Sequence, residues 1–334
     1  MKRFLRLKMN TRGIVLLVCA CLWIFGGQMA GAAVTVRIGH VLNPDHPWNI
    51  GLMGLAEDVE KGTEGRVVLR IFHSSQLGNE KDLIEGLTMG TIDAALVGGS
   101  SFQSLDPKFG IEELPYAFAS SEQAYKAFDG KLGDILFGIL EQNGVVGLSW
   151  WENGFRHISN NKHPIEKPAD LAGIKIRVTP QKMRLDTFTA LGASPMPIAF
   201  GELYSALQQG VVDAQENPLA IFVSNGFGEV QKHLSLTGHI WTSAVLCVNS
   251  GVWKKVSDAD KAMFRTFAAK WRDAERKMIR DADTNLVEEI RKAGVDVREV
   301  DKMAFREAVK SVWASFEPQF GADLIELIRE AGKD

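Results

Sequence analysis

The chain has 334 residues, of which 46% are hydrophobic and 24% are charged, and its 41 acidic residues outnumber 38 lysines and arginines. This composition is typical of a globular protein, and the length leaves room for more than one domain. The acidic balance argues against nucleic acid and anionic membranes as partners, because both attract basic proteins.

The N-terminal segment differs from the rest of the chain. Five basic residues lie in Lys2–Arg12, no charge occurs in the range Gly13–Val36, and Ile14–Phe25 is almost continuously apolar. The small residues Ala30–Ala32 form a cleavage site, so residues 1–32 are predicted to be a secretory signal peptide. A retained membrane anchor is the rival interpretation, but the apolar run is shorter than the roughly 20 residues of a spanning helix.

Removal of this leader changes the charge and the cysteine content. Taking five of the 38 basic residues away leaves 33 against 41 acidic ones, a net charge of −8, so any anion site must be built locally. Cys19 and Cys21 leave with the leader, and the apolar residues after Cys21 argue against a lipid-attachment site there. Cys247 then stands alone in the apolar run Ala244–Val248, which predicts a packed thiol and no disulfide framework.

Strands and helices are predicted to alternate after the leader. Val34–Gly39 alternates as a strand and is followed by the polar loop Asn43–Trp48. Helical spacing covers Ile50–Lys61, a second strand covers Arg66–Phe72, and a second helix covers Glu80–Met89. This alternation predicts an α/β domain with parallel strands.

A faint internal repeat indicates a second, similar lobe. Leu87–Ala94 matches Leu207–Ala214 in the pattern L-x-x-G-x-(Ile/Val)-D-A, and each copy follows an amphipathic helix. The glycine suits the left-handed position that ends a helix. A polar run follows each copy, Gly98–Ser101 in the first and Gln215–Asn217 in the second. Ligands of open parallel sheets bind beyond the carboxyl ends of strands, so both runs are expected to face one cleft between two lobes.

The C-terminal third is predicted to be helical. Ser257 is a suitable N-cap, and neither proline nor glycine occurs from there to Ala293. The segment is therefore one helix of over thirty residues or two helices joined by a kink, against a usual length of about 11–12. Either it braces two lobes of a monomer or it pairs with another chain as a coiled coil. Bracing is favoured because the apolar positions keep no strict heptad.

Arg177 is the strongest candidate for ligand contact. It lies near the end of the strand-like run Gly173–Val178, just before Thr179-Pro180, and Asn217 lies at a second strand exit. A solvated position on an exposed face is the alternative for Arg177. Its place at the exit of a strand in a covered sheet favours a bidentate contact with a carboxylate.

Further candidates have two interpretations each. Trp151 either packs in the core or lines the cleft, and Arg156 either pairs with Glu152 or supplies a second anion contact. Phe200 opens a helix and suits a hydrophobic staple better than a ligand contact. His46 and Trp48 lie in the loop after the first strand, where the geometry permits contact with a ligand but the residue types do not require it.

Motifs for catalysis and cofactors are missing from the sequence. There is no P-loop, no G-x-G-x-x-G after a strand, no G-x-S-x-G, and no H-x-x-x-H or C-x-x-C pair. Asp213 and Glu216 could form an acid/base pair, but the repeat explains Asp213 structurally. We therefore expect no cofactor, no metal and no enzymatic activity.

Several segments, in order and spacing, resemble the extracytoplasmic solute receptors of TRAP transporters, the DctP family. They are Gln76–Gly78, Leu114–Tyr116, Asn153–Arg156, Gly173–Arg177, Pro197–Tyr204 and Ala206–Pro218. The resemblance implies an α/β, two-lobed periplasmic binding protein-like fold with a long helix bracing both lobes. Lobe I would comprise residues 33–154 and 243–282, and lobe II residues 155–242 and 283–334.

The resemblance also implies roles for single residues. Arg177 matches the arginine that binds the ligand carboxylate, and Asn217 matches the asparagine that hydrogen-bonds the same group. Arg156 matches a second arginine that often contacts the ligand, and Phe200 an aromatic residue of the pocket wall. The small run Gly98–Ser101 replaces the charged residues of sialic-acid receptors, which argues against sialic acid. The first-lobe contacts are expected to come from His46, Trp48, Ser100, Trp151 and Glu152, a set able to meet several hydroxyl groups.

The implied function is capture of an organic acid in the periplasm by cleft closure and delivery to the membrane subunits of a TRAP permease. The pocket is similar to the hexuronate-binding branch, so a sugar acid is the expected ligand of a monomeric receptor. Three alternatives stay open: a receptor for C4-dicarboxylates or keto acids, a protein that presents its ligand to a sensor kinase, and an exported enzyme on the same scaffold.

Overall fold

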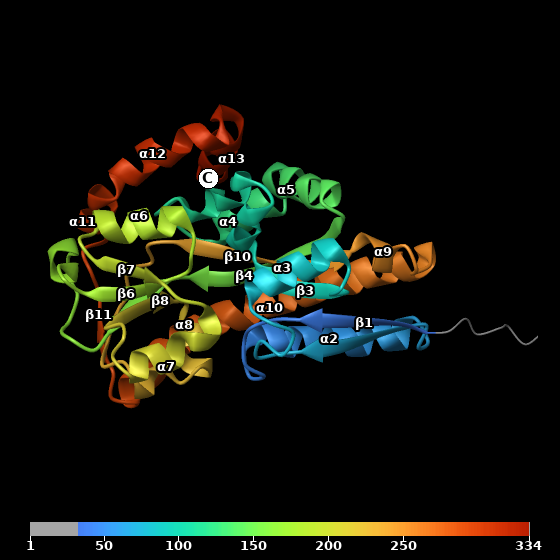
Figure 1. The fold of residues 1–334 in the computed structure, drawn as a ribbon, viewed down its shortest axis with the longest axis horizontal. Coiled ribbons are helices and arrows are strands. Elements are labelled where there is room, and N and C mark those ends of the chain that lie inside the picture. The colour runs from blue at the N-terminus through green and yellow to red at the C-terminus, as the bar shows by residue number, and fades with distance from the viewer. Residues whose placement is uncertain (1–32, 334) are drawn as a thin grey trace, which may run out of the picture.

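The structure is a computed structural model that describes residues 33–333. The predicted signal peptide lies outside the described residues. Two β-sheets lie side by side, each with helices packed on it (Figure 1). We call the five-stranded sheet with its helices lobe I and the six-stranded sheet with its helices lobe II.

Lobe I is built on a sheet with strand order β2-β1-β3-β10-β4. Its β2, β1 and β3 run parallel, as the alternation of strands and helices predicts, whereas β10 is antiparallel to both β3 and β4. The strands are β1 (Val34–Gly39), β2 (Val67–Phe72), β3 (Ala94–Gly98), β4 (Val145–Phe155) and β10 (Trp241–Asn249). The helical elements between them are α2 (Pro47–Gly62), α3 (Glu80–Met89), α4 (Ser121–Phe128), α5 (Lys131–Gln142), α9 (Ser250–Trp253) and the 3-10 turns η1 (Gly99–Ser104) and η2 (Pro107–Glu113).

Lobe II is built on a sheet with strand order β11-β9-β5-β8-β6-β7. Its strands are β5 (His157–Asn160), β6 (Lys175–Val178), β7 (Ser194–Pro197), β8 (Ala214–Asn217), β9 (His233–Ser235) and β11 (Asp296–Arg298). The helices are α6 (Lys182–Ala190), α7 (Leu203–Gln208), α8 (Leu219–Ser224), α11 (Lys302–Ala308), α12 (Lys310–Phe320) and α13 (Ala322–Ala331), with the 3-10 turns η3 (Pro168–Leu171), η4 (Phe200–Glu202) and η5 (Phe227–Glu229). The last two helices reach across the lobes, because α12 packs on α6 whereas α13 packs on α4.

Three connections join the lobes. Only Arg156 separates the end of β4 from the start of β5, and the chain returns from β9 to β10 through residues 236–240. The third connection is α10 (Asp258–Lys292), a single helix of 35 residues capped by the hydroxyl of Ser257. It packs on α2 and β4 of lobe I and on α8 and β11 of lobe II, which confirms that the long helix braces both lobes (Figure 1).

The sequence repeat corresponds to the same structural element in both lobes. Gly90 and Gly210 follow their helices with φ angles of 77° and 70°, in the left-handed region that favours glycine. The aspartates of the repeat then anchor neighbouring strands: Asp93 accepts a hydrogen bond from the backbone N–H of Arg37, and Asp213 accepts one from that of Lys175, both at 3.0 Å. The structural explanation of Asp213 is therefore confirmed.

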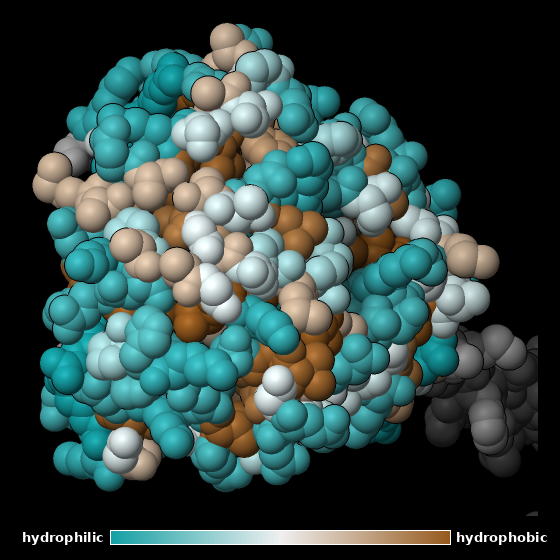
Figure 2. All heavy atoms as spheres, turned by 60° about the vertical axis from the view of Figure 1, so that its left-hand side comes forward, coloured by the Kyte–Doolittle hydropathy of each residue, from teal (hydrophilic) through white to brown (hydrophobic). Residues whose placement is uncertain are grey.

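Within residues 33–333, no helix combines the length and the apolar character needed to cross a membrane. On the face shown in Figure 2, hydrophilic residues cover most of the surface, and hydrophobic residues show mainly in hollows between them. Cys247 is fully buried in β10, where its thiol donates to the carbonyl of Ala95, as expected for a packed thiol.

Candidate functional site

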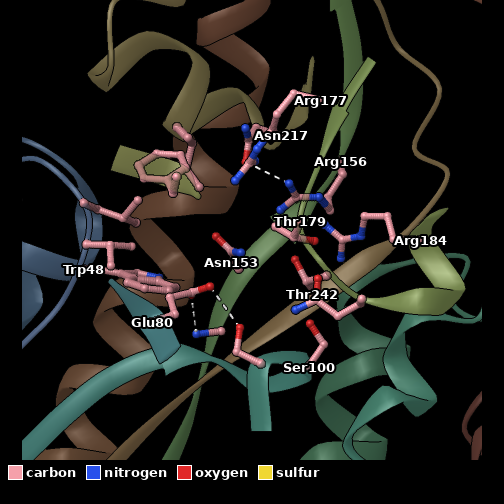
Figure 3. A pocket seen from close by; sticks show the side chains of 17 residues that line it. Trp48, Glu80, Ser100, Asn153, Arg156, Arg177, Thr179, Arg184, Asn217 and Thr242 are labelled. Atoms are coloured by element: carbon pink, nitrogen blue, oxygen red, sulfur yellow. Dashed lines mark hydrogen bonds between the residues drawn. The ribbon is translucent and has the colours of Figure 1, made fainter. Parts of the chain in front are cut away.

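A cavity lies where the two lobes face each other (Figure 3). It opens into an outer cleft, with which it shares Glu80, Arg177 and Phe200 as lining residues. Side chains from the strand and helix ends of both lobes line it, among them Trp48, Glu80, Ser100, Asn153, Arg156, Arg177, Thr179, Gln181, Arg184, Phe200, Asn217 and Thr242. The site thus lies beyond the strand ends, where the repeat placed it.

Arg177 is buried at this cavity with only 1% of its surface exposed. Its Nε donates to the carbonyl of Ile198 at 2.9 Å, and its guanidinium lies 5.9 Å from the ring centre of Phe200. Its Nη1 is buried and finds no hydrogen-bond partner in the described part of the chain. Burial, together with the positive charges of Arg156 and Arg184, lowers the pKa of Arg177 to about 10 against the opposing effect of Glu216. This guanidinium carries a positive charge that no bonded carboxylate of residues 33–333 compensates.

Arg156 is held by lobe II rather than by Glu152. Its Nε donates to one carboxylate oxygen of Glu216 at 2.5 Å, and its Nη2 donates to the other at 3.0 Å. The same Nη2 donates to the side-chain oxygen of Asn217 at 2.8 Å. The proposed pairing of Arg156 with Glu152 is therefore wrong, because the strand register places Glu216 of β8 opposite Ile158, two residues after Arg156. Arg156 lines the cavity with its charge already balanced.

Arg184 forms a second ion pair at the same wall. Its Nε donates to Glu113 of η2 at 2.7 Å, and its Nη1 donates to Glu216 at 3.0 Å. His239 completes the cluster, with its Nε2 3.2 Å from Glu216. Burial alone would raise the pKa of Glu216, but Arg156 and Arg184 hold it well below its usual range. The cluster is a buried set of bonded, opposite charges that joins η2 of lobe I to α6 and β8 of lobe II.

The lobe I wall consists of an aromatic ring and short polar groups. The indole N–H of Trp48 donates to the carbonyl of Glu152 at 2.7 Å, which holds the ring against the cavity. The backbone N–H of Ser100 donates to the buried carboxyl group of Glu112 at 2.7 Å. Glu80 also lines this wall, where it accepts hydrogen bonds from the last residue of β3 and from η1.

Six of the nine residues predicted for the site line the cavity: Trp48, Ser100, Arg156, Arg177, Phe200 and Asn217. Trp151, Glu152 and His46 do not. Strand β4 runs from Val145 to Phe155, so Trp151 and Glu152 are strand residues. The indole of Trp151 is fully buried and donates to Ser149.

Glu152 and His46 have structural partners instead. The carboxylate of Glu152 accepts hydrogen bonds from Ser121 at 2.7 Å and from the indole of Trp241 at 2.9 Å. His46 is the N-cap of α2, since its Nδ1 accepts a hydrogen bond from the backbone N–H of Trp48. The structure thus places these two residues and Trp151 outside the lining of the cavity.

Other cavity residues were missed by the sequence-based prediction. Two of them could have been predicted from the sequence. Asn153 lies in the run Asn153–Arg156 that resembles the DctP family, and Thr179 directly follows the strand of Arg177. No sequence pattern marks Glu80 or Arg184 as a cavity residue, since each lies in the first turn of an amphipathic or polar helix. Their role at the cavity depends on how the lobes are placed against each other.

This architecture defines a class of protein: a two-lobed α/β protein with a cavity between its lobes, in whose wall the guanidinium of Arg177 is buried without a bonded carboxylate in residues 33–333. Within this class, the chain belongs to the bacterial extracellular solute-binding proteins of family 7, the DctP family, whose model matches residues 38–319.

Named relatives agree with this assignment. The chain is 33% identical over 304 residues to the 2,3-diketo-L-gulonate-binding periplasmic protein YiaO of Escherichia coli K12, a match covering 90% of this chain and 92% of the relative. It is 40% identical to a TRAP periplasmic solute binding protein from Polaromonas sp. JS666 bound to D-erythronate, with a TM-score of 0.86 over 89% of this chain and 98% of the other. The sugar acid binding protein DctPAm from Advenella mimigardefordensis, in complex with galactonate, is 32% identical with a TM-score of 0.87 over 90% and 98% of the two chains.

Proposed function

We propose that this protein is the solute receptor of a TRAP transporter and binds a sugar acid through its carboxylate at Arg177. The observation that carries the proposal is the buried guanidinium of Arg177, whose Nη1 has no hydrogen-bond partner in the described residues. A buried, unpaired charge costs free energy, and a bound carboxylate would offset that cost with bidentate hydrogen bonds. Asn217 would add its second amide N–H beside it, because its oxygen accepts from Arg156 and its other N–H donates to the side-chain oxygen of Gln215.

The remainder of the cavity suits a polyhydroxylated ligand. Ser100, Asn153, Thr179 and Thr242 supply neutral hydrogen-bonding groups, and Trp48 and Phe200 supply aromatic surface on the two lobes. Sugar acids present a carboxylate, several hydroxyl groups and a hydrocarbon face that can pack on an indole. The relatives that hold D-erythronate and galactonate support this ligand class.

Capture by closure follows from the position of the cavity. The segments 33–154 with 243–282 and 155–242 with 283–334 would move as two bodies, joined by their three connections and by the packing of α13 on α4. A ligand that touches both lobes stabilises the closed arrangement, because it makes fewer contacts when the lobes part. The closed receptor would work as a monomer in the periplasm, after removal of its leader, and deliver the acid unchanged to the membrane permease.

Isothermal titration calorimetry on receptor freed of ligand by unfolding and refolding tests this function. Each sugar acid is compared with the alditol that lacks its carboxylate: D-galactonate with galactitol, D-gluconate with glucitol and D-erythronate with erythritol. Loss of a buried charge pair costs about 2–5 kcal/mol, so the preferred acid should bind at least about 30-fold more tightly than its alditol. The proposal fails if no acid in the panel binds better than its neutral partner.

A further inference from the structure

Glu80 is the acidic residue of the cavity wall that has no cationic partner within the described residues. It is the first residue of α3, directly after the N-cap Asn79. One carboxylate oxygen accepts a hydrogen bond from the backbone N–H of Gly98 at 3.2 Å, and the other accepts one from the hydroxyl of Ser101 at 2.9 Å. These bonds hold the carboxylate at the lobe I side of the cavity, near Trp48, while Arg177 lies on the other side (Figure 3).

The charges around the cavity balance in pairs. Arg156 is bonded to Glu216, and Arg184 is bonded to Glu113 and Glu216. Arg177 and Glu80 remain as a positive and a negative group on facing lobes. They interact across the space between them, since the charge of Glu80 is among those that raise the pKa of Arg177. The cavity is therefore polarised, with its positive end in lobe II and its negative end in lobe I.

A carboxylate oxygen can accept more than one hydrogen bond, so Glu80 keeps lone pairs for a donor from the ligand. A hydroxyl group would donate to it in a charge-assisted hydrogen bond. A second carboxylate at the same place would instead put two negative charges together, and their repulsion would grow as closure of the lobes removes water from between them.

We propose that Glu80 sets the substrate class of this receptor: it accepts a hydroxyl group of the ligand and excludes acids that carry a second carboxylate. The inference rests on the proposed function, since it takes the first carboxylate to lie at Arg177. Aldonates and similar monocarboxylates would bind, whereas aldarates and C4-dicarboxylates would be rejected.

An ammonium group is the other donor that Glu80 could accept. The neighbouring groups favour a hydroxyl, because Ser100, Asn153 and Thr242 are neutral and can each donate or accept. A polyol chain uses such groups along its length, whereas an ammonium on an aliphatic chain would leave them without partners. An amino acid with a terminal ammonium therefore serves as a separate arm of the test.

Two pairs of ligands with the same hydroxyl configuration isolate the second carboxylate: D-galactonate with galactarate, and D-gluconate with D-glucarate. Titration calorimetry on ligand-free receptor should show the aldarate binding at least about 100-fold more weakly than the aldonate. Glu80→Gln keeps an acceptor for Gly98 or Ser101 but removes the charge. It should reduce the ratio of aldonate affinity to aldarate affinity at least tenfold. Glu80→Ala, which also removes the charge, should narrow it as well and serves if the first variant does not fold.

Glu85→Gln is the matched control. Glu85 lies on the same helix and borders the outer cleft, but its side chain is 60% exposed and pairs with Lys81 at 3.7 Å. Its removal should leave the aldarate-to-aldonate ratio within about threefold of the wild-type value, because exposed charges are screened by solvent.

The outcomes separate the two proposals. Binding of neither aldonates nor aldarates overturns the proposed function itself. Equal binding of aldonate and aldarate by the wild-type receptor, or a ratio that Glu80→Gln leaves unchanged, overturns the role of Glu80 while the receptor function stands. Tighter binding of 6-aminohexanoate than of either aldonate overturns the choice of a hydroxyl group as the partner of Glu80.

Discussion

Replacing Glu216 with glutamine tests the buried charge cluster that builds one wall of the cavity. The carboxylate accepts hydrogen bonds from Nε and Nη2 of Arg156 and from Nη1 of Arg184, and it lies 3.2 Å from His239. All of these side chains are buried. Glutamine has nearly the same shape, so the change removes the charge and one acceptor while it preserves the packing.

The expected loss is large because Arg156 keeps no other bonded carboxylate within the described residues. Arg184 retains Glu113, whereas Arg156 retains only the carbonyl of Glu216 and the side-chain oxygen of Asn217. The new amide N–H₂ would also face an arginine N–H in place of an acceptor oxygen. Breaking a buried ion pair on one side costs about 3–5 kcal/mol, and we expect Glu216→Gln to lower the free energy of unfolding by that amount.

Urea denaturation at pH 7 measures this free energy. Because Arg156 and Arg184 hold the pKa of Glu216 below its usual range, the stabilisation is present above pH of about 4.3 and is lost as the pH falls through the folded-state pKa. The control is Asp186→Asn on α6, which breaks the exposed pair with Lys182 and should cost less than about 1 kcal/mol. A loss below 1 kcal/mol for Glu216→Gln would refute the reasoning.

Two further changes test single features of the fold. Burial, with the neighbouring charge of Glu152, raises the pKa of Glu275 well above its usual range, and one of its oxygens has no partner in the described residues. Glu275→Gln should therefore be more stable than wild type above pH of about 4.3, with a gap in unfolding free energy that widens by about 1.4 kcal/mol per pH unit up to the folded-state pKa. On α5, a Cβ at Gly133 would lie 1.7 Å from the carbonyl oxygen of Phe128, whereas one at Gly138 would meet nothing within 4 Å. Gly133→Ala should destabilise by about 1–3 kcal/mol and Gly138→Ala should stabilise by about 0.5–1 kcal/mol in thermal melts.

Each of these changes has a result that contradicts it. A pH-independent difference between Glu275→Gln and wild type, measured by urea denaturation at pH 5, 6 and 7, would show that Glu275 does not keep its proton in the folded protein. Equal melting temperatures for the two glycine variants would show that the close approach at Gly133 is absent.

The sequence predicted those parts of the fold that depend on neighbours along the chain. The cap at Ser257 and the run without proline or glycine predicted α10, and the repeat predicted Gly90, Gly210 and their aspartates as equivalent elements. Arg177 and Asn217 were placed at strand exits, and the structure brings both to one cavity. Their contact with a ligand remains a prediction.

Contacts between residues that lie far apart in the sequence could not be predicted from local sequence patterns. Arg156 bonds to Glu216 because β5 pairs with β8, a register that no local pattern shows. Trp151 and Glu152 lie within a strand because β10 pairs with β4 along nearly its whole length, a pairing between distant parts of the chain. Glu80 becomes a cavity residue only when lobe I faces lobe II.

The central claim is that Arg177 holds the carboxylate of the ligand, and the affinity of Arg177→Gln for the preferred sugar acid tests it most directly. Arg298→Gln is the control, since Arg298 lies in the same lobe but is exposed and pairs with Asp296 at the surface. Titration calorimetry should show Arg177→Gln binding the acid at least about 30-fold more weakly than wild type, with the control within about threefold. Its unliganded form should be at least as stable as wild type, because the buried unpaired charge is gone. Wild-type affinity in Arg177→Gln would contradict the account.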